Sequence, residues 1–221
     1  MEERKHIVIL AAGDFPTHPV PLRALREADF VVCCDSAYRQ WKEESEKRKM
    51  EKPYVVIGDG DSLSETDKRD LGDRYIQVDE QDFNDLHKAM DYATSHFQPS
   101  TFNFQLLGAT GRREDHTLGN ISYLVTFAEE YPSADIEMLT DHGRFTAMHG
   151  SRTFASFPRQ QVSIFTMDPQ TAIYSDGLKW SLNAFHARRW WQATLNEALG
   201  TEFSLRTEGW AVVFLTYEPK N

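Results

Sequence analysis

The feature that most constrains this chain is the alternation of short apolar runs with amphipathic segments over about its first 140 residues. The runs are rich in β-branched and aromatic residues, as buried strands are. They are His6–Ala12, Phe30–Cys34, Tyr54–Ile57, Tyr75–Val78, Phe102–Leu107 and Ile136–Leu139. Strands that alternate with helices predict an α/β fold with a mostly parallel sheet covered by helices on both faces.

Between these runs, apolar residues recur at the three- and four-residue spacing of an amphipathic helix. The pattern is clearest over Leu86–Phe97 and Leu118–Ala128, and a shorter pattern comprises Leu22, Leu25 and Ala28. The highly charged segment Glu43–Lys52 indicates a solvated helix end or a loop.

After about Gly143 the helical periodicity disappears, and short runs lie between turn residues. They are Gln161–Thr166, Gly177–Leu182, Glu202–Arg206 and Trp210–Thr216. The segment Glu197–Gly200 is also compatible with a helical turn. We therefore expect an α/β domain over residues 1–142, followed by a small antiparallel β-sandwich domain over residues 143–221.

Composition narrows the class of protein. The net charge is −10, from 24 basic and 34 acidic residues, which argues against a nucleic-acid-binding surface. The apolar run Ile7–Ala12 is too short for a signal-peptide core or a membrane span. The two cysteines, Cys33 and Cys34, are adjacent and do not suit a disulfide framework. We therefore expect no nucleic-acid partner, no membrane insertion and a cytoplasmic location.

Aspartates follow the predicted strands at the point where each strand ends. They are Asp35, Asp59, Asp61 and Asp79. One such aspartate is more often a turn or helix-cap residue. Together, however, they would lie on one edge of the sheet, where like charges repel unless a cation joins them. Asp59 and Asp61 would point to the same side of an extended segment. The set predicts a site for Mg²⁺, which prefers carboxylate oxygen.

More acidic residues occupy the segment Asp79–Lys88 at a predicted helix start. Asp82 fits a helix N-cap, with Asp85 as a partner in a capping box. Lys88 lies one turn after Asp85, so either a structural ion pair or a phosphate contact suits it.

A glycine- and arginine-rich loop, Gly108–His116, lies between the fifth strand and the Leu118–Ala128 helix. Glycines let backbone approach a phosphate, helix N-termini favour anions, and arginines bind phosphate oxygens in pairs. The loop lacks the Lys-Ser/Thr of a Walker A motif and the spacing of a dinucleotide fingerprint. Many loops of this composition are only turns.

In this order, these segments resemble the thiamine pyrophosphokinase family. The resemblance is carried by Cys34–Ala37, Ile57–Ser62, Asp79–Lys88, Gly108–His116 with Asn120, and Gly177–Leu182 followed by Thr194–Asn196. It covers nearly the whole chain. It implies transfer of a diphosphate from ATP to thiamine with release of AMP, a requirement for Mg²⁺, and a homodimer with sites shared between subunits. The first domain would bind ATP and Mg²⁺, and the second would bind thiamine.

The resemblance also assigns residues. The metal ligands would be Asp35, Asp59, Asp61 and Asp85, of which the last three, with Lys88, form the catalytic group. ATP would contact Asp35, Ser36, Gly108, Gly111, Arg112, Arg113, Asp115, His116 and Asn120. Thiamine would contact Gln81, Trp180, Thr194 and Asn196. The thiazolium cation suits an acidic site and a tryptophan face.

The chain departs from the family pattern in three places. Asn84 replaces a threonine, Arg112 replaces the second glycine of a pair, and Ala193–Leu195 replaces Ser-Thr-Ser. Two other functions stay open: another Mg²⁺-dependent nucleotidyl- or phosphotransferase, and a non-catalytic module that senses thiamine or a nucleotide. An aromatic acceptor site at Trp180 and the presence of all central carboxylates favour the transferase.

Overall fold

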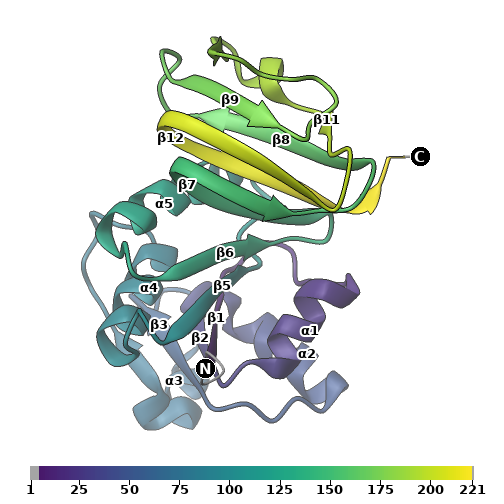
Figure 1. Cartoon of the computed structure of the whole chain (residues 1–221). Coiled ribbons are helices and arrows are strands. Elements are labelled where there is room, and N and C mark those ends of the chain that lie inside the picture. Colours follow the sequence, from purple (N-terminus) through teal and green to yellow (C-terminus); the bar gives the residue numbers. More distant parts are fainter. Residues whose placement is uncertain (1–4, 221) are drawn as a thin grey trace. The chain divides into compact units, whose positions relative to one another are not determined.

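Two compact units divide the chain in a computed structural model that describes residues 5–220 (Figure 1). One unit extends to Tyr123 and includes Tyr131–Asp141; the other comprises Leu124–Glu130 and the residues from His142 onward. The first contains a parallel sheet with helices and the second is rich in antiparallel strands. The predicted fold class is therefore confirmed.

The sheet of the first unit has the order β6-β5-β1-β2-β3-β4, and every pair is parallel. Its strands are β1 (Lys5–Leu10), β2 (Phe30–Cys34), β3 (Tyr54–Gly58), β4 (Tyr75–Gln77), β5 (Phe102–Leu107) and β6 (Asp135–Leu139). Ile7, Val8 and Ile9 of the central strand are fully buried. Burial on both faces explains why continuous apolar runs predicted the central strands, whereas the edge strand β4 is only partly buried.

Helices cover both faces of this sheet, with α1 and α2 on one side and α4 on the other (Figure 1). The helical segments are α1 (Pro19–Glu27), η1 (Asp35–Ala37), α2 (Tyr38–Arg48), α3 (Glu65–Leu71), η2 (Gly72–Arg74), α4 (Asp85–His96) and α5 (Glu114–Glu130). The three apolar patterns correspond to α1, α4 and α5. The charged segment Glu43–Lys52, expected as a helix end or a loop, contains both, because α2 ends at Arg48. The helix α3 was not predicted, since Leu71 is its one buried residue.

The second unit consists of β7 (Gly143–Ala155), β8 (Gln160–Thr166), β9 (Ala172–Asp176), β10 (Phe185–His186), η3 (Trp190–Ala193), β11 (Asn196–Glu197) and β12 (Glu202–Pro219). The long strand β12 pairs with β7 along most of its length. Its first part also pairs with β9 and its second part with β8, so two layers share β12. Phe154 and Phe203 stack in the core between them, with ring centroids 5.2 Å apart.

Two expectations for this unit are wrong. The runs Glu202–Arg206 and Trp210–Thr216 are one strand, interrupted by a bulge between Thr207 and Ala211. The segment Gly177–Leu182 is not a strand: Gly177 has φ +78°, and the chain turns so that Ser175 N–H donates to Leu182 O. For Glu197–Gly200 the helical alternative is also excluded, because the segment begins in β11 and continues into a bridge.

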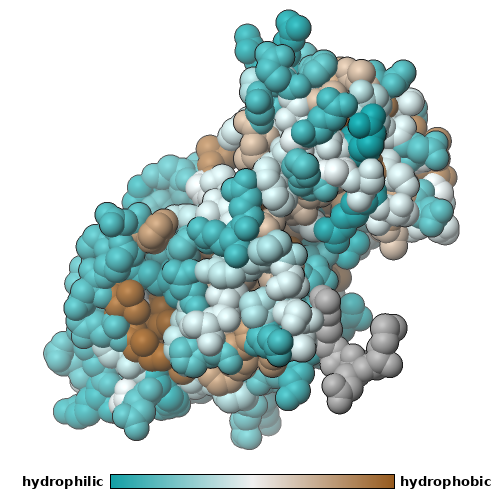
Figure 2. All heavy atoms as spheres, turned by 60° about the vertical axis from the view of Figure 1, so that its left-hand side comes forward, coloured by the Kyte–Doolittle hydropathy of each residue, from teal (hydrophilic) through white to brown (hydrophobic). Residues whose placement is uncertain are grey.

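The face shown in Figure 2 is predominantly hydrophilic, in keeping with a chain in which 26% of the residues are charged. Over residues 5–220, no helix combines the length and apolarity needed to cross a membrane. In the second unit, several large apolar side chains are nevertheless exposed. They are Trp180, Trp190, Trp191, Leu195 and Leu199.

Candidate active site

The strand order reverses at β1, because β2 lies on one side of it and β5 on the other. In open parallel sheets, ligands bind at such a reversal, beyond the carboxyl ends of the strands. The loops after β1 and β5 pack directly against each other there: Gly13 N–H donates to Gly108 O (2.6 Å) and Asp14 N–H to Thr110 O (2.9 Å). A Cβ on Gly13 would lie 2.1 Å from Thr110 O, so this approach requires glycine.

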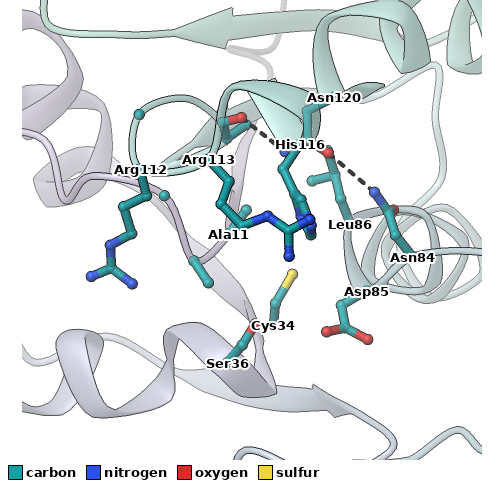
Figure 3. Close-up of a pocket in the computed structure, with 14 residues that line it drawn as sticks. Ala11, Cys34, Ser36, Asn84, Asp85, Leu86, Arg112, Arg113, His116 and Asn120 are labelled. Atoms are coloured by element: carbon teal, nitrogen blue, oxygen red, sulfur yellow. Dashed lines mark hydrogen bonds between the residues drawn. The ribbon is translucent and has the colours of Figure 1, made fainter. Parts of the chain in front are cut away.

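A cavity of about 340 Å³ opens beside these loops (Figure 3). Its lining comes from the ends of β1, β2 and β5 and from the first turns of α4 and α5. The lining residues are Ala11, Ala12, Gly13, Cys34, Ser36, Asn84, Asp85, Leu86, Ala109, Gly111, Arg112, Arg113, His116 and Asn120. Of the predicted ATP contacts, Ser36, Gly111, Arg112, Arg113, His116 and Asn120 meet here, whereas Asp35, Gly108 and Asp115 are outside this lining.

Asn120 lines the cavity, and both the nitrogen and the oxygen of its side-chain amide form hydrogen bonds there. Its Nδ2 donates to Ala109 O (2.8 Å), and its Oδ1 accepts from Asn84 Nδ2 (3.1 Å), as the dashed lines in Figure 3 show. These bonds join the glycine-rich loop to the first turn of α4. Asn84 is also the N-cap of α4, where its Oδ1 accepts from His87 N–H. The expectation that Asp82 caps this helix is therefore wrong.

The two arginines of the loop point in different directions (Figure 3). Arg113 extends across the cavity and binds Asp115 through two bonds, Nε–Oδ1 at 3.1 Å and Nη2–Oδ2 at 2.5 Å. This pair holds the pKa of Asp115 well below its usual range, at about 2. Arg112 points to the side, and its backbone has φ +57°.

Asp35, directly after β2, is the most buried carboxylate of the acidic group, with 2% of its surface exposed. Its Oδ2 accepts from Gly60 N–H (2.9 Å), and it packs so closely on Gly58 that a Cβ there would lie 2.4 Å from Asp35 Cγ. Burial, reinforced by the nearby Asp85 and Asp59, raises the pKa of Asp35 to about 6, although backbone hydrogen bonds oppose this shift. The carboxylates are therefore close enough to repel one another.

Asp59 and Asp61 do not lie in an extended segment, because Gly60 has φ +84°. Instead, Asp59 Oδ1 accepts from Asp61 N–H (3.0 Å), and its Oδ2 accepts from Gln81 Nε2 (3.2 Å). These bonds hold the pKa of Asp59 below its usual value. A turn rather than a strand joins Asp59 and Asp61, so the expectation that both carboxylates point to the same side of an extended segment is wrong.

Tyr75 and Lys88 lie beside the same group of acidic residues. Burial and the charges of Asp35, Asp59, Asp79 and Asp61 raise the pKa of Tyr75, whose hydroxyl lies beside Gly60. Lys88, almost fully buried in α4, has its Nζ 3.7 Å from Asp85 Oδ1. Tyr75 was not singled out from the sequence, because no motif marks it.

This donor set fits Mg²⁺. It offers several carboxylate oxygens, and burial together with the charges of Asp85 and Asp59 raises the pKa of Asp35, an effect that a bound cation would oppose. Within the described residues, no three of these aspartates bring oxygens within 4.8 Å of one another. Such spacing suits an ion that keeps water ligands and also binds substrate phosphates.

A second cavity, of about 540 Å³, adjoins the first. It is lined by Asp35, Ser36, Arg39, Gln40, Glu43, Ser62 and Arg112. Ser36 and Arg112 line both cavities. No sequence motif marks Gln40, because it reaches this cavity through contacts between segments that are distant in the sequence.

In the second unit, the three predicted contact residues lie on neighbouring segments. Asn196 fixes the backbone of Trp180 on both sides: its Oδ1 accepts from Trp180 N–H (3.1 Å), and its Nδ2 donates to Trp180 O (2.7 Å). Trp180 is 50% exposed, and Lys179 Nζ lies 4.8 Å from the centre of its ring. Thr194 Oγ1 donates to Trp191 O (2.8 Å). Asn196 is thus the structural support of an exposed aromatic side chain.

Sequence comparison identifies two family profiles along the chain. Residues 22–136 match "Thiamin pyrophosphokinase, catalytic domain", and residues 143–214 match "Thiamin pyrophosphokinase, substrate-binding domain". Thiamine pyrophosphokinase 1 of Oryza sativa subsp. japonica is 29% identical over 145 residues, which are 60% of this chain and 53% of that protein. Thiamine pyrophosphokinase 2 of Arabidopsis thaliana is 29% identical over 62% of this chain and 54% of its own length. The matches span about half the length of these relatives.

Solved structures share the fold at lower identity. Thiamin pyrophosphokinase from Candida albicans superposes with a TM-score of 0.78 at 17% identity, covering 97% of this chain and 90% of that one. The enzyme of the same name from Bacillus subtilis gives 0.75 at 19% identity, covering 96% and 99%. The similarity in fold extends over both units.

Proposed function

The chain belongs to the thiamine pyrophosphokinase family, and on that premise we propose that it transfers a diphosphate group from ATP to thiamine. The hydroxyl oxygen of thiamine forms a bond to the β-phosphorus of ATP. The bond from that phosphorus to the oxygen bridging the α- and β-phosphates breaks, and AMP leaves with the electron pair. The hydroxyl proton passes to a carboxylate or to water.

The observation that carries this proposal is that basic and acidic side chains share two adjoining cavities: Arg113 and Asp85 line the first, and Asp35 lines the second with Arg112. The Gly108–His116 loop and the N-terminus of α5 supply arginines and backbone N–H groups, which bind phosphate. The acidic residues Asp35, Asp59, Asp61 and Asp85 would hold Mg²⁺, which neutralises phosphate charge when bound. Phosphoryl transfer asks a protein mainly for positioning and charge neutralisation, and these groups supply both.

We propose that Lys88 contacts the phosphates of ATP and does not only pair with Asp85. Its Nζ is 3.7 Å from Asp85 Oδ1, longer than a hydrogen bond, and the side chain is almost fully buried. The Lys88 charge also helps to lower the pKa of Asp59. A buried ammonium group held only by such longer contacts gains from a further anion. Gln81, which donates to Asp59, is assigned to thiamine beside the metal centre.

We also propose that the domains over residues 1–142 and 143–221 bind ATP with Mg²⁺ and thiamine, respectively. Two chains would form a homodimer, with Trp180, Thr194 and Asn196 of one subunit completing the site of the other. The test mixes inactive Asp61→Asn subunits with Trp180→Ala subunits. Shared sites regain activity in the mixed dimer, because one site receives both intact halves. Activity no higher than that of the parents, after proven subunit exchange, contradicts shared sites.

A cytoplasmic location is part of the same proposal. Cys33 and Cys34 are both buried and form no disulfide, as expected of a protein kept in a reducing compartment.

Product analysis tests the proposed reaction. The purified chain is incubated with ATP, Mg²⁺ and thiamine, and nucleotides and thiamine esters are separated by chromatography. The proposal expects thiamine diphosphate and AMP in equal amounts. ADP with thiamine monophosphate would indicate a different phosphotransferase. Tight binding of thiamine or ATP without any product would indicate a sensing module.

A further inference from the structure

Gln40 lies in α2, at the wall of the second cavity, and its side-chain amide contacts three separate segments. When the Gln40 amide is oriented so that Nε2 faces the loop after β1, Nε2 donates to Gly13 O (3.3 Å). Its Oε1 then accepts from Phe15 N–H (3.2 Å) and from Arg112 Nη2 (3.3 Å). One half-buried amide therefore connects α2, the loop after β1 and the glycine-rich loop before α5.

Arg112 lies at the junction of the two cavities, since both include it in their lining. Its backbone has φ +57°, and it follows Gly111, where a Cβ would lie 2.1 Å from Asp14 Oδ2. The direction in which Arg112 leaves the loop is therefore set by tight packing. The side chain itself is long, and it needs a contact near its end to stay in one place.

The partners of the two arginines differ in charge. Arg113 is paired with the carboxylate of Asp115, which offsets its charge. Within residues 5–220, Arg112 forms no ion pair, and its contact is with the neutral amide oxygen of Gln40. A neutral acceptor fixes a guanidinium group without cancelling its charge, which leaves that charge available to an anion.

We propose that Gln40 is a positioning residue that holds the Arg112 guanidinium at the junction of the two cavities, where it binds the phosphates of the nucleotide. The identity of the ligand rests on the proposed function. The competing explanation is that Gln40 only braces the Gly13–Phe15 loop, with Arg112 as an incidental neighbour.

A double-mutant cycle separates these explanations. ATP binding is measured by titration calorimetry for the wild type, Gln40→Leu, Arg112→Ala and the double variant, each with its urea stability as a control for folding. Arg112→Ala removes the ion pair to phosphate, and Gln40→Leu releases the guanidinium that forms it, so each single substitution is expected to weaken ATP binding about tenfold. The double variant is expected to bind as Arg112→Ala does, because Gln40 acts through Arg112.

Two results overturn the proposal: unchanged ATP affinity in Gln40→Leu, or a loss that persists in full when Arg112 is already alanine. The second result indicates loop bracing. Gln40→Glu is a second variant that keeps size and both acceptor contacts but loses the donor to Gly13 O, so its urea stability is measured beside its ATP affinity. Its carboxylate would offset the Arg112 charge, and we expect ATP binding at least tenfold weaker. Wild-type affinity in this variant also contradicts the proposal.

The product assay keeps this inference distinct from the proposed function. If the wild type makes thiamine diphosphate and AMP while the cycle is additive, the reaction stands and the role of Gln40 is wrong. If the cycle shows the expected coupling but nothing is transferred to thiamine, Gln40 positions Arg112 for a nucleotide used in another reaction. Where transfer to thiamine is observed, the KM for thiamine serves as the internal reference, because Arg112 is assigned to the nucleotide.

Discussion

Replacing Asp35 by asparagine is expected to stabilise the metal-free protein at neutral pH. Asp35 is 2% exposed, and burial together with Asp85 and Asp59 raises its pKa from 3.8 to about 6. Asparagine has nearly the same shape, and its Oδ1 can still accept from Gly60 N–H. The substitution therefore removes a charge that folding disfavours and keeps the hydrogen bond.

The sign and size follow from the two pKa values. Below pH 3.8 the carboxyl is protonated in both states and contributes no difference. Between pH 3.8 and about 6 the unfolded chain releases the proton and the folded chain keeps it, so stability falls as pH rises. Above that range, the buried charge of Asp35 destabilises the folded state by the full amount. A shift of about two units corresponds to roughly 3 kcal/mol, as an order of magnitude.

Urea denaturation with EDTA at pH 5 and pH 7.5 measures this difference. We expect Asp35→Asn to exceed the wild type by about 3 kcal/mol at the higher pH and by about half of that at the lower pH. Added Mg²⁺ should reverse the order, because the ion binds the wild-type carboxylate. Asp73→Asn, at an exposed position, controls for the general relief of negative charge. An Asp35→Asn gain that is absent at pH 7.5, or equal to that of the control, refutes the argument.

Four further substitutions test the site. Asp59→Asn or Asp61→Asn should abolish turnover with the fold intact, because asparagine keeps the turn but loses a metal ligand; a circular dichroism spectrum and a kinetic assay check both parts. Arg113→Ala should raise the KM for ATP by roughly 10- to 150-fold, the equivalent of a charged hydrogen bond, and leave that for thiamine nearly unchanged; the opposite selectivity means that the loop serves thiamine. Asn196→Ala should lower the free energy of unfolding by about 1–3 kcal/mol, since it leaves the backbone of Trp180 unpaired, and an unchanged urea midpoint would contradict that role.

The parallel sheet was predictable because its central strands are buried on both faces, which leaves a continuous apolar signature such as Phe30–Cys34. The carboxyl-end aspartates followed from that sheet without knowledge of any contact. The strand β7 gave no such signal. Its sequence, GRFTAMHGSRTFA, mixes polar and apolar residues, since one face is solvated and several residues lie at the surface. This strand forms because it pairs with β12, and its local sequence alone does not indicate a strand.

Other errors arose where side chains bind the backbone. Asp59 accepts a hydrogen bond from Asp61 N–H and turns the chain, whereas the spacing alone suggested an extended segment. Asn84 rather than Asp82 caps α4, and both residue types are good caps, so composition did not decide between them. Gln40 and Tyr75 face the site through tertiary contacts, which have no counterpart in a local pattern.

Two of the departures from the family pattern coincide with left-handed backbone. Arg112, in place of a glycine, has φ +57°, and Leu195, within the altered Ser-Thr-Ser element, has φ +60°. A side chain in this region costs about 1–2 kcal/mol relative to an ordinary conformation. Such residues persist where their surroundings fix them. Gln40 binds the Arg112 side chain, and Ser163 Oγ accepts from Leu195 N–H at 3.1 Å. The Arg112 side chain places a guanidinium group at the junction of the two cavities, which a glycine at this position could not do. In this chain the left-handed position after Gly111 therefore carries a charged side chain, and a contact with Gln40 in α2 holds that side chain in place.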